Sequence, residues 1–141
     1  MKVFADAAYW LATARLRDQW QEAAIRARAG VGESLLVTTD EVLTEFLAGM
    51  SACGRDLRLV AVETVERLLG DPNVEVIPQS RQGFLTGLEL YRERLDKTYS
   101  LTDCISMQTM RREGLTEVLT NDRHFQQEGF RVLILQPGGS V

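Results

Sequence analysis

Residues 118–125 read VLTNDRHF, a short apolar run followed by polar residues and an acid. Val118 and Leu119 predict a buried strand that runs to Thr120, and Asp122 comes two residues after that strand. Three more acids hold comparable places, each just after an apolar run or early in the helical pattern that follows one: Asp6, Glu45 and Asp103. Because the carboxyl ends of parallel strands meet at one edge of a sheet, we expect these four acids to lie together there.

Short apolar runs alternate with helical patterns along the whole chain. The predicted strands cover residues 2–5, 35–37, 74–77, 118–119 and 132–135. The helices between them begin at capping residues, which are Asp18, Thr39 or Asp40, Asp56, Ser80 and Thr102 with Asp103. Strands that alternate with helices pair in parallel through right-handed crossovers. We therefore predict an α/β fold, a three-layer α/β/α sandwich with a parallel sheet of about five strands, and a frayed tail over residues 137–141.

The composition is that of an ordinary globular protein. With 141 residues, 45% of them hydrophobic and 26% charged, the chain is expected to form one domain, residues 1–141, around a sizeable core. We expect no secretory signal and no membrane segment, because there is no basic leader and no apolar stretch of spanning length. Cys53 and Cys104 lack the spacing of a metal finger, so we expect reduced thiols and a cytoplasmic protein.

The charge balance bears on possible partners. A net charge of −4 argues against a nucleic-acid partner, since phosphate binding is normally driven by Lys and Arg. However, a carboxylate cluster that holds a metal adds negative charge locally while cations line its rim. Of the 16 basic residues, all but Lys2 and Lys97 are arginine, which suits bidentate phosphate contact. Solvated helix faces explain this arginine bias equally well.

Four converging carboxylates repel one another unless a divalent cation or raised pKa values offset their charge. Oxygen ligands suit Mg²⁺ or Mn²⁺, and such ions activate water for attack on phosphorus, so the acids indicate a metal-dependent phosphodiesterase. Taken singly, Asp103 also suits a helix start, and Asp122 also suits a turn. Asp6 and Glu45 interrupt apolar surroundings, where Asp6 in particular has no local structural role that demands an acid.

These residues resemble the PIN domain family, and within it the single-domain VapC-type toxins of bacterial toxin–antitoxin pairs. The resemblance covers nearly the whole chain, and its landmarks are the strand ending in Asp6 and residues 37–45, 101–105 and 119–125. It implies a PIN-like nuclease domain, usually dimeric, that cleaves RNA endonucleolytically with Mg²⁺ or Mn²⁺. It also implies a cognate antitoxin protein whose tail lies across the acidic groove.

By this resemblance, the metal would be held by the quartet Asp6, Glu45, Asp103 and Asp122. Thr120 would be the family's hydroxyl near the metal, able to hydrogen-bond a ligand carboxylate or water. One departure from the family pattern concerns the residues after the first acid, where the family usually has Ser, Thr or Asn and this chain has Ala7 and Ala8. A polar contact near the metal is therefore missing or supplied by another residue.

Other polar and aromatic residues are assigned secondary roles. His124, the single histidine, is assigned to a turn with Phe125 packed inward, because a metal-activated water needs no histidine base. Candidates for an RNA-facing rim are Lys97, Arg111, Arg112 and Arg123, although a solvated helix face explains each of them alone. Trp10 and Trp20 are candidate anchors for a second subunit or an antitoxin, with core packing expected for at least one.

Two alternatives belong to another functional class. The first is a catalytically weak or inactive PIN-like scaffold that binds RNA or a partner protein, which Ala7 and Ala8 favour. The second, a receiver-like switch, ranks lower because it needs an acidic pair after the first strand and a lysine after the last. Phosphate-loop, dinucleotide-binding and serine-hydrolase motifs are absent from the sequence, and position 8 lacks the second acid of a dehalogenase-like phosphatase.

Overall fold

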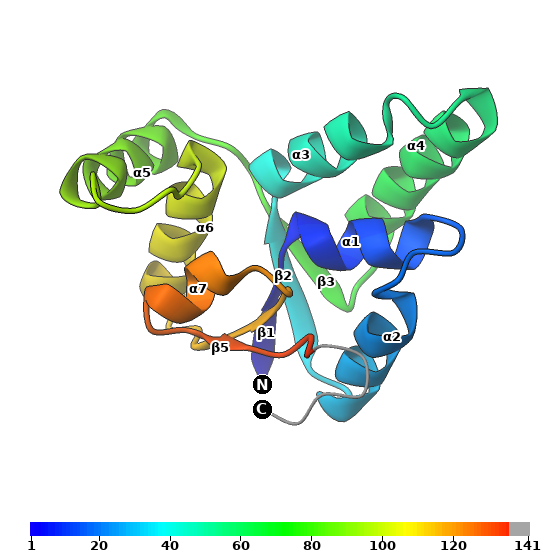
Figure 1. The fold of residues 1–141 in the computed structure, drawn as a ribbon, viewed down its shortest axis with the longest axis horizontal. Coiled ribbons are helices and arrows are strands. Elements are labelled where there is room, and N and C mark those ends of the chain that lie inside the picture. Colours follow the sequence, from blue (N-terminus) through cyan, green and yellow to red (C-terminus); the bar gives the residue numbers. More distant parts are fainter. Residues whose placement is uncertain (136–141) are drawn as a thin grey trace.

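The computed structural model of the protein describes residues 1–135 (Figure 1). In chain order its elements are β1 (Lys2–Ala5), α1 (Ala7–Ala14), α2 (Gln21–Gly30), β2 (Leu35–Thr39), α3 (Asp40–Met50), α4 (Arg55–Gly70), β3 (Val74–Ile77), α5 (Arg81–Glu93), α6 (Leu101–Arg112), β4 (Glu117–Leu119), α7 (Arg123–Gln127) and β5 (Arg131–Val132). The predicted frayed tail, residues 137–141, lies outside the described residues.

All five strands form one parallel sheet in the order β3-β2-β1-β4-β5. Figure 1 shows α1, α2, α3 and α4 on one side of this sheet and α5, α6 and α7 on the other. The prediction of a parallel α/β sheet of about five strands is thus confirmed. The chain builds from β1 through β2 to β3, then returns to add β4 beside β1. The carboxyl ends of β1 and β4 therefore border the switch point, where open α/β sheets place their ligands.

Side-chain caps begin four of the seven helices within residues 1–135, which are α3, α5, α6 and α7. Thr39 begins α3 by accepting a hydrogen bond from the backbone N–H of Val42 (3.1 Å), as one of the two predicted caps. Asp18, in contrast, does not cap α2, which begins at Gln21, because its carboxylate accepts from the N–H of Trp20 (2.8 Å) in a turn before the helix. Similarly, α4 begins one residue before Asp56, after a glycine at position 54 with φ of 90°.

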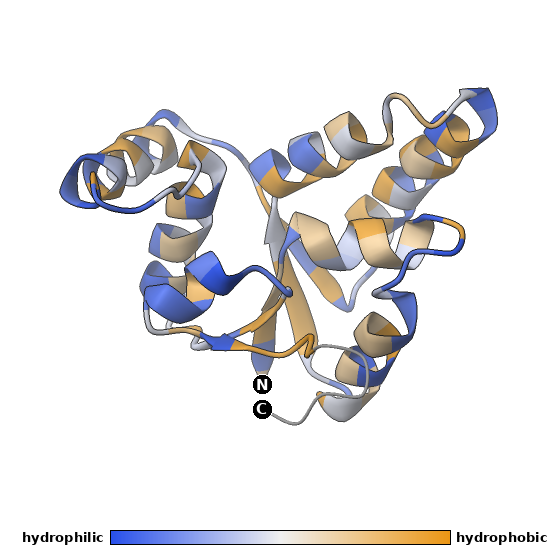
Figure 2. Cartoon of the chain, viewed as in Figure 1, coloured by the Kyte–Doolittle hydropathy of each residue, from blue (hydrophilic) through white to orange (hydrophobic). Residues whose placement is uncertain are grey.

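The core lies between the sheet and the helices that cover it. Figure 2 shows the strands mostly in hydrophobic colours and the helices with mixed faces. Ala61 and Leu68 of α4 are buried in this core. Trp10 is also buried, with its indole N–H 3.5 Å from the Thr38 hydroxyl, so it is not a surface anchor. None of the helices within residues 1–135 has the length and apolar character needed to cross a membrane.

The last strand is shorter than predicted, and α5 carries an exposed apolar stripe. The strand β5 covers Arg131–Val132 instead of residues 132–135, although the N–H groups of Leu133 and Ile134 still donate to carbonyls of β4 and of Thr120 (3.0 and 3.2 Å). The apolar stripe of α5 faces solvent. We call its exposed residues, Phe84, Leu85, Leu88 and Tyr91, the α5 apolar face.

Candidate active site at the carboxyl edge of the sheet

Asp6 and Thr120 meet where the neighbouring strands β1 and β4 end. The Thr120 hydroxyl donates a hydrogen bond to Oδ2 of Asp6 (2.9 Å) and accepts one from the N–H of Asp122 (3.1 Å). Asp6 precedes α1, yet its side chain makes no capping hydrogen bond to that helix, and only 4% of the residue is exposed. A buried carboxylate with no capping role indicates a functional one.

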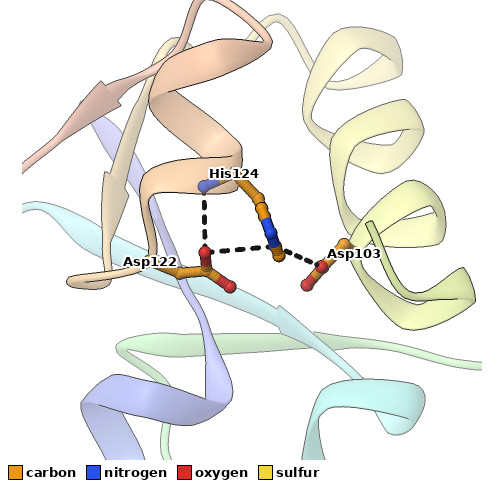
Figure 3. Close-up of side chains that lie close together, drawn as sticks. All are labelled: Asp103, Asp122 and His124. Atoms are coloured by element: carbon orange, nitrogen blue, oxygen red, sulfur yellow. Dashed lines mark hydrogen bonds and ion pairs between the residues drawn. The ribbon is translucent and has the colours of Figure 1, made fainter. Parts of the chain in front are cut away.

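Asp103 and Asp122 approach each other from two helix N-termini. Asp103 forms a capping box with Ser100, in which each side chain accepts from the other residue's backbone N–H (3.0 Å for both). Asp122 caps α7 by accepting from the N–H of His124 (2.9 Å). Both acids therefore have the structural roles that the sequence allowed. Ligand atoms of Asp103, Asp122 and His124 lie within 4.8 Å of one another, close enough to share one ion (Figure 3).

Glu45 approaches the same region from α3, roughly one and a half helical turns after β2, and the residue is exposed. Partial burial raises the pKa of its carboxyl, and the negative charges of Asp103 and Asp122 raise it further, against a hydrogen bond with Thr102 that lowers it. Within residues 1–135, the three-residue group of ligand atoms includes neither Glu45 nor Asp6. The structure thus places Asp103 and Asp122 in direct proximity and couples Glu45 to them through charge.

The electrostatics of the site disfavour four ionised carboxylates. Burial raises the pKa of Asp6 to about 7, and the charges of Asp103 and Glu45 add to this, while hydrogen bonds from Thr120 and the Ala7 backbone oppose it. Burial also raises the pKa of Asp103, with Asp122 adding to it and contacts from Ser100 and His124 opposing it. A cation in this region would relieve both the burial of charge and the mutual repulsion.

The donor atoms fit a hard divalent cation. Oδ2 of Asp103 accepts from Ser100 and lies 3.1 Å from Nδ1 of His124, and Oδ1 of Asp122 accepts from the backbone of His124. Within the described part of the chain, the second oxygen of each of these two aspartates accepts no hydrogen bond. Carboxylate oxygens left free by the protein are the ligands that Mg²⁺ and Mn²⁺ prefer.

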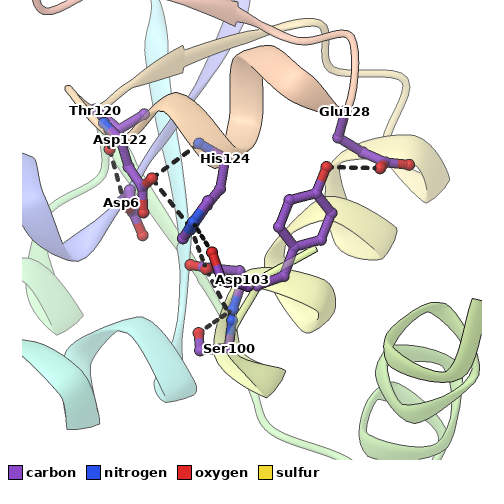
Figure 4. Close-up of polar contacts among 9 residues, drawn as sticks. Asp6, Ser100, Asp103, Thr120, Asp122, His124 and Glu128 are labelled. Atoms are coloured by element: carbon purple, nitrogen blue, oxygen red, sulfur yellow. Dashed lines mark hydrogen bonds and ion pairs between the residues drawn. The ribbon is translucent and has the colours of Figure 1, made fainter. Parts of the chain in front are cut away.

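A polar network that the sequence did not predict lies beside the site (Figure 4). Nε2 of His124 lies 2.9 Å from the Thr98 hydroxyl, and the ring centroids of His124 and Tyr99 are 5.4 Å apart. The Tyr99 hydroxyl donates to Glu128 (3.0 Å), whose side chain is only 4% exposed and accepts two hydrogen bonds from Arg94 (2.9 Å each) and one from Arg111. Burial opposes ionisation of Glu128, but these hydrogen bonds outweigh it and lower its pKa to about 2.

This network changes the assignment of the candidate rim cations. Arg111 is bound to Glu128 and is therefore not a free RNA-facing cation. Arg112 and Lys97 lie near the neighbouring acids Glu113 and Asp96, at 3.7 and 3.5 Å. Among residues 1–135, Arg123 makes no ion pair and is exposed, so it is the candidate that best fits the predicted rim.

The site residues that were not predicted differ in whether the sequence carries a local signal for them. Ser100 lies three residues before Asp103, the spacing of a capping box, and could have been recognised from that spacing. Phe125 is fully buried, as predicted, but the His124 side chain points to Asp103 and Asp122 instead of serving only a turn. Glu128 had no local signal, because its partner Arg94 is 34 residues away.

A group of acids at the switch point of a parallel sheet, with carboxylate oxygens that accept no hydrogen bond from residues 1–135, is typical of α/β proteins suited to divalent-cation chemistry. The PIN domain family model matches residues 3–130. The chain therefore belongs to the PIN domain family. No protein of curated function matches it in a sequence search.

Solved structures give the same fold. VapC20 from Mycobacterium tuberculosis, described as a sarcin–ricin loop cleaving toxin, aligns with 96% of this chain and 99% of its own at a TM-score of 0.82 and 22% identity. FitAcB from Neisseria gonorrhoeae covers 94% of this chain and 96% of its own, with a TM-score of 0.67 and 16% identity. DNA-bound VapBC from Salmonella typhimurium has the same coverages, with a TM-score of 0.66 and 18% identity.

Proposed function

We propose that this protein is a metal-dependent endoribonuclease, the toxin of a toxin–antitoxin pair, and that it acts on RNA in the cytoplasm. Membership of the PIN domain family and the fold shared with VapC20 support nuclease activity in general. The observation that carries the proposal is the approach of Asp103 and Asp122, whose ligand atoms lie with that of His124 within 4.8 Å of one another, while Thr120 links Asp122 to the buried Asp6. The raised pKa values of Asp6, Glu45 and Asp103 agree with this crowding. A cation among these carboxylates would offset their mutual repulsion and the cost of burying them in ionised form.

The proposed metal ligands are Asp6, Glu45, Asp103 and Asp122, with Mg²⁺ or Mn²⁺ as the ion. When bound, the ion supplies Lewis-acid activation for in-line attack of water on the phosphodiester. Thr120 orients Asp6 through its hydroxyl (2.9 Å) and so supplies the polar contact that Ala7 and Ala8 do not. Arg123 is exposed at the start of α7 and is available for RNA phosphate.

We also propose a cognate antitoxin and a homodimer as partners. FitAcB and VapBC are the relatives that support a protein partner. A basic side chain of the antitoxin would pair with the carboxylates and compete with the metal. The α5 apolar face supports the dimer, because Leu88 is 42% exposed between Phe84 and Tyr91 on one stripe of the helix.

The test compares RNA cleavage by the wild type with Asp6→Asn and Asp122→Asn in Mg²⁺ and in Mn²⁺. An RNA that carries a sarcin–ricin loop is the first substrate to try, because VapC20 cleaves that loop. Both variants should lose cleavage by about 100-fold or more and should no longer inhibit growth when expressed. Asp56→Asn is the matched control, since Asp56 is an exposed acid in the first turn of α4 and should cleave as the wild type does.

The same experiment separates the enzyme from an inactive scaffold. A wild-type protein that binds RNA without cutting it in either metal, and whose growth inhibition persists in Asp6→Asn, would refute the nuclease proposal. That result would instead favour the scaffold, for which Ala7 and Ala8 are the supporting observation.

A further inference from the structure

The His124 side chain lies between Asp103 and Asp122, two acids that come from different helix N-termini (Figure 3). Its Nδ1 is 3.1 Å from Oδ2 of Asp103 and 3.2 Å from Oδ1 of Asp122. We propose that His124 is a positioning residue for the metal site, which braces these two carboxylates so that their second oxygens stay available to the ion. The inference rests on the proposed metal-dependent function.

The contacts of the imidazole define which nitrogen carries a hydrogen. Nδ1 faces two carboxylate oxygens, and because ionised carboxylates only accept hydrogen bonds, the tautomer that fits this site carries its hydrogen on Nδ1, which donates to Asp103 with Asp122 within reach. Nε2 lies 2.9 Å from the Thr98 hydroxyl, which can donate to it. One ring therefore bridges the two acids at its inner edge and is held by a hydroxyl at its outer edge.

The contacts of the His124 ring with Asp103 and Asp122 determine which carboxylate oxygens remain without a hydrogen bond. On Asp103 both protein contacts, from the Ser100 backbone and from the ring, converge on Oδ2. On Asp122 the His124 backbone N–H and the ring both converge on Oδ1. Within residues 1–135 this leaves Oδ1 of Asp103 and Oδ2 of Asp122 without hydrogen bonds, each fixed in direction by its partner oxygen. Partners of this kind orient ligands and typically contribute 10- to 100-fold to metal affinity.

The ring is itself anchored, so that it can hold the acids in place. Tyr99 packs beside it with a centroid distance of 5.4 Å, and the Tyr99 hydroxyl donates to the buried Glu128 (3.0 Å). Arg94, at the end of α5, and Arg111, in α6, donate hydrogen bonds to the Glu128 carboxylate. The imidazole is thus linked through Tyr99 and Glu128 to α5, α6 and α7, which lie on one side of the sheet (Figure 1).

Substitution of the ring leaves the helix caps in place. The Ser100–Asp103 box and the bond from the His124 backbone to Asp122 use no atom of the imidazole. An asparagine at this position puts its amide nitrogen about where Nδ1 lies, whereas a glutamine puts its amide nitrogen nearer to Nε2. His124→Asn therefore retains the donor that the proposal requires, and His124→Gln and His124→Ala remove it.

The experiment measures Mn²⁺ affinity by calorimetry on the wild type and the three variants, with urea unfolding of the metal-free proteins to show that each is folded. His124→Ala and His124→Gln should bind Mn²⁺ about 10- to 100-fold more weakly, and His124→Asn should stay within about threefold of the wild type. Thr98→Val, which releases only the outer edge of the ring, should give an intermediate loss. RNA cleavage by His124→Ala should recover at saturating Mn²⁺, as a loss of ligand orientation requires.

Two results would overturn the inference. If His124→Ala binds Mn²⁺ as tightly as or more tightly than the wild type, the ring does not prepare the carboxylates and at most competes with the ion. If His124→Asn is as weak as His124→Ala, the donor at Nδ1 is not the cause. Failure of the wild type to bind Mn²⁺ at all would instead refute the proposed function, so the two failures are distinguishable.

Discussion

Asp6→Asn is expected to stabilise the metal-free protein at neutral and higher pH. In the folded chain Asp6 is buried at the end of β1, and burial raises its pKa from 3.8 to about 7. A group whose pKa is higher in the folded state contributes stability below its unfolded pKa and loses it as pH rises toward the folded value. Ionisation of Asp6 therefore lowers the free energy of unfolding progressively between about pH 4 and about pH 7.

The size of the effect follows from the shift. About three pKa units at about 1.4 kcal/mol each amount to about 4 kcal/mol, which ionised Asp6 costs the folded metal-free state at pH 8. Asparagine carries no charge at any pH, and its carbonyl oxygen can still accept the hydrogen bond from Thr120. It also removes one negative charge near Asp103 and Glu45. The free energy of unfolding of Asp6→Asn should therefore exceed that of the wild type by an amount close to the cost of ionised Asp6.

The assay is urea unfolding in the presence of a chelator at about pH 5 and about pH 8. Between pH 5 and pH 8 the free energy of unfolding of the wild type should fall by about 3 kcal/mol more than that of Asp6→Asn. The reason is that Asp6 ionises over roughly two pH units of this range, from about pH 5 to about pH 7. With excess Mg²⁺ the order should reverse, since only the wild type gains binding energy from the ion. Asp56→Asn again serves as the control and should follow the wild type under both conditions.

Equal pH dependence of the two proteins between pH 5 and pH 8 would refute this reasoning. It would mean that Asp6 is not held in a buried environment, and that the end of β1 is more open than the 4% exposed fraction of Asp6 indicates.

Three further outcomes are expected. Glu128→Gln should destabilise the protein by on the order of 3 kcal/mol, because it leaves two arginines without their buried anion, and urea unfolding measures this. Since the pKa of Glu128 is lowered from 4.5 to about 2, its contribution should be complete above pH 4.5 and disappear as pH falls toward 2, whereas a flat acid profile would contradict the pair. Thr120→Val should weaken Mn²⁺ binding by about 10-fold in calorimetry while the protein stays folded, and unchanged affinity would exclude its role in orienting Asp6. Gly87→Ala should lower stability by about 1 to 3 kcal/mol, because an added Cβ meets the side chain and backbone of Ile105 where α5 packs on α6, and a neutral effect would show that the two helices separate easily.

The fold was accessible from the sequence because its strands are short, continuous apolar runs. Strands buried on both faces need such runs, and β1, β2 and β4 have them next to the acids. The positions of Asp6 and Asp122 followed from topology alone, since residues after parallel strands lie at one edge. The same reasoning predicted Asp103 and Glu45 near that edge, on the helices that follow, and their role as metal ligands stays a prediction.

The features that the sequence did not predict depend on contacts between side chains that are far apart in the sequence. The orientation of His124 requires α6 and α7 to present their N-termini to each other, and no local pattern encodes that approach. Likewise, the stripe on α5 has the spacing of a core-facing helix, yet Phe84 and Leu88 are exposed. Periodicity shows that a helix has an apolar face but not whether the chain itself covers that face.

The hydrogen bond between Thr120 and Asp6 joins residues that are 114 positions apart in the chain. The acids beside it lie after β1, in α3, in the first turn of α6 and at the N-cap of α7, so only a fragment that spans residues 6–122 contains the whole set. On the proposed function, a growing polypeptide would therefore not cut RNA until Asp122 has left the ribosome and β4 has inserted beside β1. The spacing of the proposed ligands along the chain would then delay the first cut until most of the chain has been made.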